Sequence, residues 1–454
     1  MACSNHYTYP SFKEKWQTMR DSMDGERAMK DRTLSDKKYI PMTQGQIKDT
    51  SGGLKRYNRQ VNLAIYYDFV RQIITDSLGL MYNNAPIIKL PKSISEMETS
   101  ATVNNESLEQ LMLNTNKEQM LMGRRGLALD VVDDKSSYPV ISEYNAEHIL
   151  NWNDLIQDGF VNYDFVLLDE TSKVMNAAME WVDSKKFRVL TIVDGFYTTY
   201  VVDEKEKAIK GGIPSGIEAV QPSIHGKRYN RVPFVIANVS NTNSAIQNPA
   251  TLSIADLSIA LFRGEADYRT YLHMSGQDTL IFTGVKEQES KNIRLGAGAH
   301  CSFSTDAKVF FAGVSGSSLT EMKASNDSIA ERIASQGVSF VESGKAESGE
   351  ALSIRSTTKT ASLTVIAKVG ARAIETILNM ALEWMGSAEV ATISPNLEFT
   401  ETKLTPKDLL DLVSYKIAGG PITDGELREL QESNGYSDGD LKVYMDKEEE
   451  ESSA

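Results

Sequence analysis

Residues 318–385 read SLTEMKASNDSIAERIASQGVSFVESGKAESGEALSIRSTTKTASLTVIAKVGARAIETILNMALEWM, and this stretch decides the fold. Apolar residues recur at helical spacing from about 320 to 340 and again from about 356 to 385. The second run predicts a helix of roughly 45 Å, which is long for a globular domain. Glycines and serines at 342–349 interrupt the pattern. The stretch predicts a helix, a polar loop and a long helix, although a helical hairpin inside an ordinary core would give the same pattern.

Length and composition place the chain among soluble globular proteins. Its 454 residues suffice for two or three domains, and 41% apolar with 24% charged residues is typical of that class. No stretch approaches the ~20 apolar residues that span a bilayer, and the first 20 residues lack the apolar centre of a signal peptide. We therefore expect a cytosolic protein without a membrane partner.

Cysteine count and charge narrow the function. Cys3 and Cys301 are too few for a disulfide framework or a cysteine-based zinc site. The net charge of −14 argues against a protein that grips nucleic acid through a broad basic face. It remains compatible with a protein past which DNA must slide.

The first half of the chain predicts helices followed by an antiparallel sheet. Residues 1–50 are polar, and we expect an extended arm with one short helix at about 12–21. The pattern then predicts helices at about 54–81 and 105–124, and short strands at 87–90 and 126–132. From 138 to 240 alternation of period two predicts an antiparallel meander that closes with residues 232–236. Asp194-Gly195 is a strong signal for a hairpin within it.

The second half predicts a small β module between two helices. A helix is expected at about 251–275, short strands at 278–314, and the helix at 320–340 follows. Residues 390–399 predict one more strand, which we expect to rejoin the meander. Helices at about 406–417 and 424–433 precede an acidic run at 448–451, a block typical of a disordered tail.

Patterns of catalytic or cofactor chemistry are missing from the sequence. There is no phosphate loop and no nucleophile elbow, and the five histidines are spread singly. His300 and Cys301 are neighbours, and the side chains of neighbours in a strand point to opposite faces. Asp130, Asp133 and Asp134 could bind a divalent ion, but a solvated turn explains them better. We expect no catalytic residue, no cofactor and no metal.

Basic residues around the β module are the remaining candidates for a site. Lys286, Lys291 and Arg294 lie in the module, and Lys323 and Arg332 lie on the helix that follows. Acidic residues are interspersed among them, so a mixed surface is the simpler interpretation. Only a ring of identical subunits would turn such isolated charges into a lined passage.

The order of these parts resembles the portal proteins of tailed bacteriophages over nearly the whole chain. The resemblance depends on the order and spacing of short segments, none of which is a catalytic signature. The matching segments are YIPM at 39–42, YNR at 57–59, AIYY at 64–67, LGLM at 78–81, APIIKLP at 85–91, FRVL at 187–190, VPF at 232–234, YR at 268–269 and SGQDTLIFTG at 275–284.

The resemblance implies an α+β portal fold. Its parts would be an antiparallel β wing, a two-helix stem, a small inserted β clip, a long helix and a helical C-terminal crown. The implied boundaries are 1–50 for an N-terminal arm, 51–250 for the wing, 251–277 and 319–341 for the stem helices, 278–318 for the clip, 342–355 for a tunnel loop, 356–386 for the long helix, 387–404 for a wing strand, and 405–454 for the crown and acidic tail.

The resemblance also implies partners and site residues. Portals form rings, most often of twelve subunits, at one capsid vertex, and double-stranded DNA passes through the ring during packaging and ejection. Lys286, Lys291 and Arg294 would belong to the clip, which docks terminase and later head-completion or tail proteins, while Lys323 and Arg332 would be channel charges of the stem. Further partners would be the major capsid and scaffold proteins, and the location would be the virion after assembly in the host bacterial cytoplasm. The residues assigned to the DNA-facing tunnel loop are Glu342, Ser343, Gly344, Lys345, Ala346, Glu347, Ser348 and Gly349.

Two alternatives from other classes stay open. A scaffold or adaptor protein of the virion without a channel would use the long helix to form a dimer or trimer. An enzyme with a metal at Asp130, Asp133 and Asp134 would lose activity on chelation without losing assembly.

Overall fold

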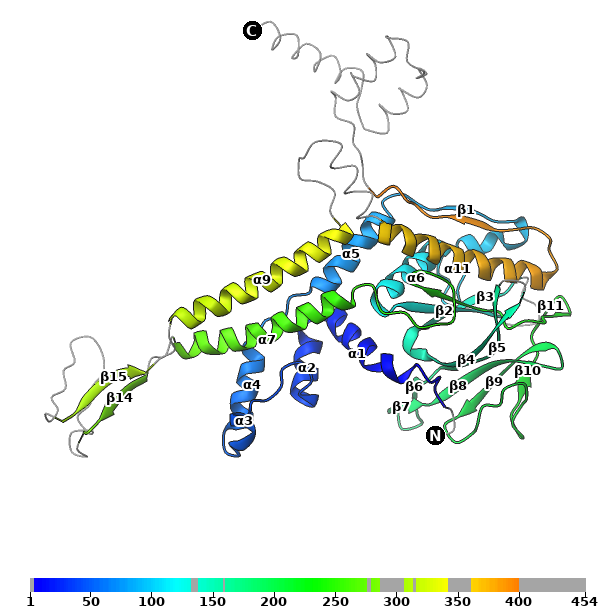
Figure 1. Ribbon diagram of the computed structural model, residues 1–454. Coiled ribbons are helices and arrows are strands. Elements are labelled where there is room, and N and C mark those ends of the chain that lie inside the picture. Colours follow the sequence, from blue (N-terminus) through cyan, green and yellow to red (C-terminus); the bar gives the residue numbers. More distant parts are fainter. Residues whose placement is uncertain are drawn as a thin grey trace, which may run out of the picture. The chain divides into compact units, whose positions relative to one another are not determined.

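The computed structural model describes residues 4–131, 138–157, 160–275, 279–285, 306–312, 316–341 and 361–399 (Figure 1). The chain divides into two compact units, residues 1–397 and 398–454, and the described helices and strands belong to the first. Helices and several small antiparallel sheets make this first unit an α+β structure. The predicted tunnel loop at 342–349 and the predicted helices at 406–417 and 424–433 lie outside the described residues.

The N-terminal segment is helical rather than extended. The predicted short helix is confirmed as α1 (Pro10–Asp24), but α2 (Glu26–Asp36) and α3 (Gln44–Lys48) follow where an extended arm was expected. Trp16, Met19 and Met29 are fully buried. Polar composition suggested an arm, yet these few apolar side chains suffice to fold the segment onto the rest of the unit.

The helix predicted at 54–81 is two helices. The first, α4 (Gly53–Leu63), ends at Ala64, where the backbone turns extended, and α5 (Phe69–Met81) begins five residues later. Ala64 and Tyr66 are buried in a cluster with Phe262, and the Tyr66 ring meets that of Phe262 edge-on at 5.7 Å. The break therefore buries residues that a continuous helix would direct elsewhere.

A three-stranded sheet forms the centre of the main core. Its strands are β2 (Arg124–Asp130), β3 (Val140–Asn145) and β13 (Phe234–Asn238), in the antiparallel order β13-β2-β3. The helix α6 (Leu108–Met122) leads into β2 through Gly123, whose φ of 85° suits glycine. The long helix α11 (Ala361–Met385) packs on β13, β2 and α6. Its apolar face is buried from Leu363 to Trp384, and the part from Ala371 onward belongs to this core.

The predicted meander is confirmed as a five-stranded sheet in the order β10-β9-β8-β5-β4. Asp194 and Gly195 form the two-residue turn that joins β8 and β9, and both have positive φ, as a type I′ turn requires. The expectation that residues 232–236 close this sheet is wrong, because β13 pairs with β2 instead. The strands are β4 (Ile149–Gln157), β5 (Phe160–Asp169), β8 (Lys186–Val193), β9 (Phe196–Asp203) and β10 (Ala219–Val220).

Short hairpins and 3-10 helices lie between the larger elements. The hairpins pair β6 (Ser172–Met175) with β7 (Trp181–Ser184), and β11 (Ser223–Ile224) with β12 (Lys227–Arg228). The 3-10 helices are η1 (Lys92–Glu98) and η2 (Ala146–His148).

Two long helices bracket a β hairpin, as the sequence predicts. The order is α7 (Leu252–Ser275), β14 (Thr279–Thr283), β15 (Lys308–Ala312) and α9 (Gly316–Val341). The two strands pair antiparallel, Thr279 with Ala312 and Thr283 with Lys308. Among the described residues, no helix combines the length and apolarity needed to cross a bilayer.

The strand predicted near 390–399 does not rejoin the meander. It is β16 (Thr392–Ser394), and it pairs antiparallel with β1 (Ile87–Lys89). The packing of α11 places β16 beside β1, since α11 contacts both β16 and α5, the helix that precedes β1. The sequence pattern near residues 390–399 predicted a strand, but it could not show which strand would pair with it.

Candidate functional site

A buried polar junction fixes the contact between α7 and α9. Asn326 of α9 donates from Nδ2 to Oε1 of Glu265 on α7 at 3.0 Å, and Arg269 donates from Nε to Oε2 of the same carboxylate at 2.9 Å. Asn326 and Glu265 are each only 6% exposed. Buried polar groups are costly unless they are hydrogen-bonded, so this junction favours one register of the two helices.

Gly264 allows the two helices to approach closely at this junction. A Cβ atom at this position would lie 2.2 Å from Oδ1 of Asn326. Real Cβ atoms essentially never show such a distance, so either the Asn326 side chain would have to leave its bond to Glu265 or the helices would have to move apart. The glycine in α7 and the asparagine in α9 therefore form one packing unit.

The opposite side of α7 holds the N-terminal segment. At about 100° per residue, positions 259, 262 and 266 lie on the side of α7 opposite to Gly264, and Glu265 lies between the two sides. Gln60 of α4 donates from Nε2 to Oδ1 of Asp267 at 2.8 Å. Burial raises the pKa of Asp267, and the bond from Gln60 works in the other direction. The buried cluster on this side contains Ile259, Phe262 and Ala266 with Met29, Tyr39, Ile40, Tyr57, Val61, Ala64 and Tyr66.

The two predicted channel charges lie on α9 but do not share a face. Lys323 and Arg332 are both exposed and form no ion pair with any residue in the described ranges. Nine residues separate them, which places them about 180° apart around the helix. A surface that contacts α9 from one direction can therefore meet only one of the two.

The other predicted site residues lie outside the described part of the chain. Lys286, Lys291 and Arg294 fall between β14 and β15, and the tunnel-loop residues 342–349 fall between α9 and α11. The strands that flank the first group, β14 and β15, are described and form the hairpin between α7 and α9.

The alternative metal site finds no support in the described residues. Asp130 accepts from Arg188 Nη1 at 2.9 Å and from the Ser142 hydroxyl, so its carboxylate is engaged in a salt bridge. Within those ranges no group of three His, Cys, Asp or Glu side chains is arranged to hold a metal. Asp133, Asp134, His300 and Cys301 lie outside them.

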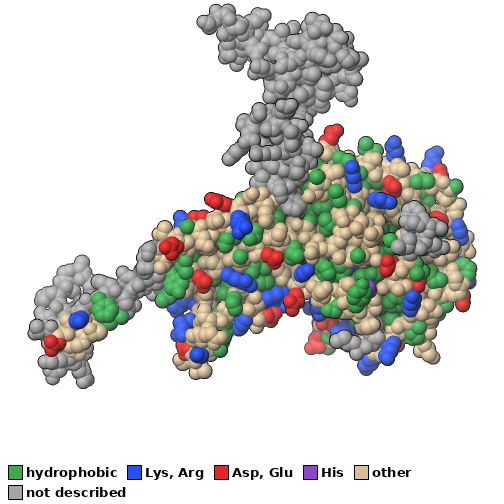
Figure 2. Space-filling view, viewed as in Figure 1, with side chains coloured by type: hydrophobic (Ala, Val, Ile, Leu, Met, Phe, Trp, Pro, Cys, Tyr) green, Lys and Arg blue, Asp and Glu red, His purple; other side chains and the backbone are tan. Residues whose placement is uncertain are grey.

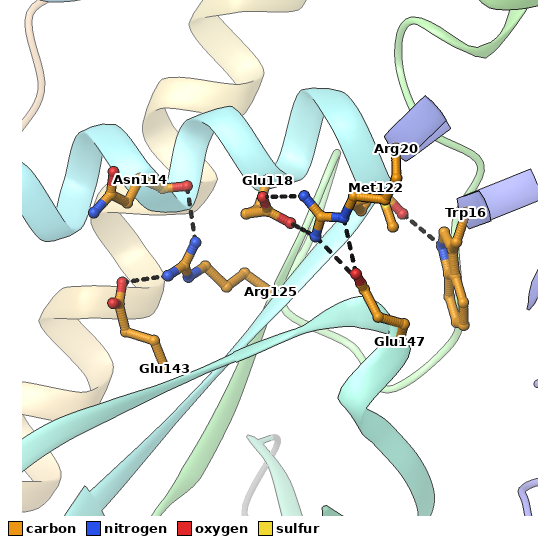
Figure 3. A network of polar contacts seen from close by, with 8 residues as sticks. All are labelled: Trp16, Arg20, Asn114, Glu118, Met122, Arg125, Glu143 and Glu147. Carbon is orange, nitrogen blue, oxygen red and sulfur yellow. Dashed lines mark hydrogen bonds and ion pairs between the residues drawn. The ribbon is translucent and has the colours of Figure 1, made fainter. Parts of the chain in front are cut away.

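A second polar network, not predicted from the sequence, joins α1 to α6 and η2 (Figure 3). The Arg20 guanidinium donates to both carboxylate oxygens of Glu118, at 2.8 and 2.6 Å, and to Glu147 at 2.8 Å. Trp16 Nε1 donates to the carbonyl oxygen of Met122 at 2.8 Å. Burial opposes the charge of Arg20, but its bonds to the two carboxylates outweigh this and raise its pKa. We call these residues the α1 clasp.

Two adjacent arginines of β2 lie next to the α1 clasp. Arg125 pairs with Glu143 at 2.6 Å and donates to the carbonyl oxygen of Asn114 at 3.3 Å. Arg124 is fully buried, and its guanidinium lies over the Trp152 ring at 4.3 Å from the centroid. Burial lowers the pKa of Arg124 to about 10. The aromatic face partly replaces the carboxylate that a buried cation normally requires.

The sequence contained a signal for the α1 clasp. Phe12, Trp16, Met19 and Met23 recur at spacings of three and four, which indicates an amphipathic helix reaching past residue 21. The ion-pair partners could not be read in the same way, because Glu118 and Glu147 are about a hundred residues distant in sequence.

One segment of the chain matches a family model, and two solved structures resemble the chain at low identity. Residues 251–385, from the residue before α7 to the last residue of α11, match a family model described as Domain of unknown function (DUF4055). No curated protein matches the chain. A chain from the neck of an empty GTA particle, computed with C6 symmetry, aligns at 10% identity over 89% of this chain and 95% of that chain, with a TM-score of 0.42. A chain from the neck of a native GTA particle, computed with C12 symmetry, aligns at 10% identity over 81% and 90%, with a TM-score of 0.39.

Proposed function

We propose that the protein is a portal subunit of a phage-like particle. Identical copies would form a ring at one capsid vertex, through which double-stranded DNA enters during packaging and leaves during ejection. Terminase would dock at the clip first, and head-completion or tail proteins would follow. No catalytic chemistry is assigned to the chain.

The observation that carries the proposal is the arrangement of residues 252–385. Two long helices, α7 and α9, pack through a buried polar junction and bracket the hairpin β14–β15, and the long helix α11 follows in the main core. This order of stem, clip, stem and long helix is the one that the portal resemblance implies. The antiparallel meander and the helices before α7 supply the part expected of a wing.

The structure also suits a ring that holds DNA weakly. The exposed cations Lys323 and Arg332 lie on α9, and the chain as a whole carries a net charge of −14. Repeated around a ring, each residue becomes a belt. Isolated cationic belts on an acidic chain bind phosphates less tightly than a uniformly basic surface, and DNA that must move benefits from weak contacts.

Electron microscopy of the purified full-length protein, combined with mass determination, tests the proposal. We expect rings with a central hole and about a dozen subunits. A stable dimer or trimer would contradict the proposal and would favour an adaptor without a channel.

A further inference from the structure

An island of positive charge lies on this acidic chain. Residues 37–63, which we call the basic lobe, contain six Lys or Arg and one Asp, whereas the whole chain has a net charge of −14. Figure 2 shows Lys and Arg side chains gathered over α3 and α4. The one acid, Asp49, pairs with Arg56. The cations of the lobe that form no ion pair with a described residue are Lys37, Lys38, Lys48, Lys55 and Arg59.

The cations of α4 point away from α7. Tyr57, Gln60 and Val61 are buried on the side of α4 that faces α7. Lys55 and Arg59 are exposed, and the helical repeat places both on the opposite side of α4. The outer face of the basic lobe is therefore positive.

The outer face of α9 has the opposite sign. Asn326 and Ile333 are buried on the side of α9 that faces α7. The helical repeat places Glu321, Asp327 and Glu331 on the side that faces away, and all three are exposed. Lys323 and Arg332 lie at the two edges of this acidic face.

Helix α7 separates the two faces. It contacts α4 through one side and α9 through the other, and Figure 1 shows α9 and the α3–α4 pair on opposite sides of it. The three packed helices thus have a positive flank and a negative flank. A heterologous contact between identical subunits joins two different patches of this kind, and it closes into a ring if the rotation allows.

We propose that the basic lobe of one subunit packs against the acidic face of α9 on the next copy of the chain. The proposal rests on the proposed ring and assigns two faces to its subunit interface. Opposite potentials would steer the copies together and fix their register.

Apolar groups within the basic lobe favour a protein partner over DNA. Ile47 and Leu54 are each 55% exposed. Protein interfaces bury such side chains, whereas contacts to the DNA backbone are made mainly by cations and polar groups. A second copy of the chain offers the acidic charge that the cations of the lobe fit, and its contact would cover Ile47 and Leu54.

Charge reversal of either face tests the proposal. The variant K48E/K55E/R59E reverses the basic lobe, and E321K/D327K/E331K reverses the face of α9. We expect each to raise the protein concentration at which half the rings dissociate by at least about tenfold, measured by mass photometry and negative-stain microscopy. Combining all six substitutions exchanges the two signs and should restore assembly. Higher salt should weaken the wild-type ring.

A matched control for the basic-lobe variant reverses three other exposed lysines, in K186E/K205E/K207E, which changes the net charge by the same amount and should leave assembly intact. Circular dichroism confirms that every variant is folded. Rings that persist in both triple variants, or a sixfold variant that does not recover, would overturn the proposal. So would a basic-lobe variant that keeps its rings but loses binding to a duplex DNA probe. If the wild-type protein forms a stable dimer or trimer, the proposed function fails instead.

Discussion

Among single residues, Gly264 sets how closely α7 and α9 approach. We expect Gly264→Ala to lower the free energy of unfolding by about 1–3 kcal/mol, because its Cβ would lie 2.2 Å from Asn326 Oδ1. Urea denaturation measures the change. Gly79→Ala in α5 is the control, since nothing lies within 4 Å of its Cβ, and it should gain about 0.5–1 kcal/mol from helix propensity. Equal effects of the two substitutions would contradict the close packing at Gly264.

The titration of Glu143 makes the free energy of unfolding depend on pH. Burial raises its pKa above the ordinary value of 4.5, nearby Glu106 adds to the rise, and Arg125 opposes it. Above pH 4.5 and up to the raised pKa, the folded state binds more protons than the unfolded state, so stability falls as pH rises through this window. We expect Glu143→Gln to flatten that slope and to be neutral or stabilising at pH 7. Urea titrations at several pH values measure the free energy of unfolding of both proteins. If Glu143→Gln were clearly less stable at pH 7 and its stability depended on pH as in the wild type, the prediction would be wrong.

At the scale of elements, α1 is held by the α1 clasp. Arg20→Met removes the partner of Glu118, whose side chain is only 7% exposed. Because an unpaired buried carboxylate is costly, we expect the free energy of unfolding to fall by about 2 kcal/mol and amide exchange in α1 to become faster. Hydrogen exchange with mass spectrometry localises the effect. Arg27→Met is the control, because Arg27 is exposed and forms no ion pair with a described residue. Faster exchange spread over the whole unit, or none at all, would argue against a local clasp.

Elements also differ in how far their positions followed from the sequence. The hairpin of β8 and β9 was predictable, because Asp194-Gly195 specifies its turn locally. The helices α7, α9 and α11 were predictable from period alone. The break between α4 and α5 was not, since it depends on burying Ala64 and Tyr66 against Phe262, about two hundred residues away.

At the scale of the whole molecule, the two stem cations should differ in function. Lys323 and Arg332 lie on opposite sides of α9, so at most one can face the lumen of a ring. We expect one of Lys323→Glu and Arg332→Glu to change DNA retention in assembled particles at least about fivefold, while the other leaves it near wild type. Packaged DNA per particle measures this in nuclease-protection assays, with ring assembly checked by microscopy. If both substitutions changed DNA retention equally, the prediction that only one of the two residues faces the lumen would be wrong.

The predicted tunnel loop allows a complementary experiment on the assembled particle. Replacing Ser343–Gly349 by a Gly-Ser linker of equal length should spare ring assembly and impair DNA packaging or retention, because the loop would lie between stem and long helix in the passage. Microscopy and nuclease protection are read on the same preparation. Wild-type DNA filling would exclude this placement.

The sequence by itself determined the α+β class, the helices α7, α9 and α11, and the hairpin turn at Asp194-Gly195. Each of these depends on period or turn chemistry within a few neighbouring residues. The tertiary structure alone decided that β16 pairs with β1, that α1 is clasped by Glu118 and Glu147, and that α7 separates a positive flank from a negative one. These features pair residues distant along the chain, and the burial that selects such partners leaves no local pattern.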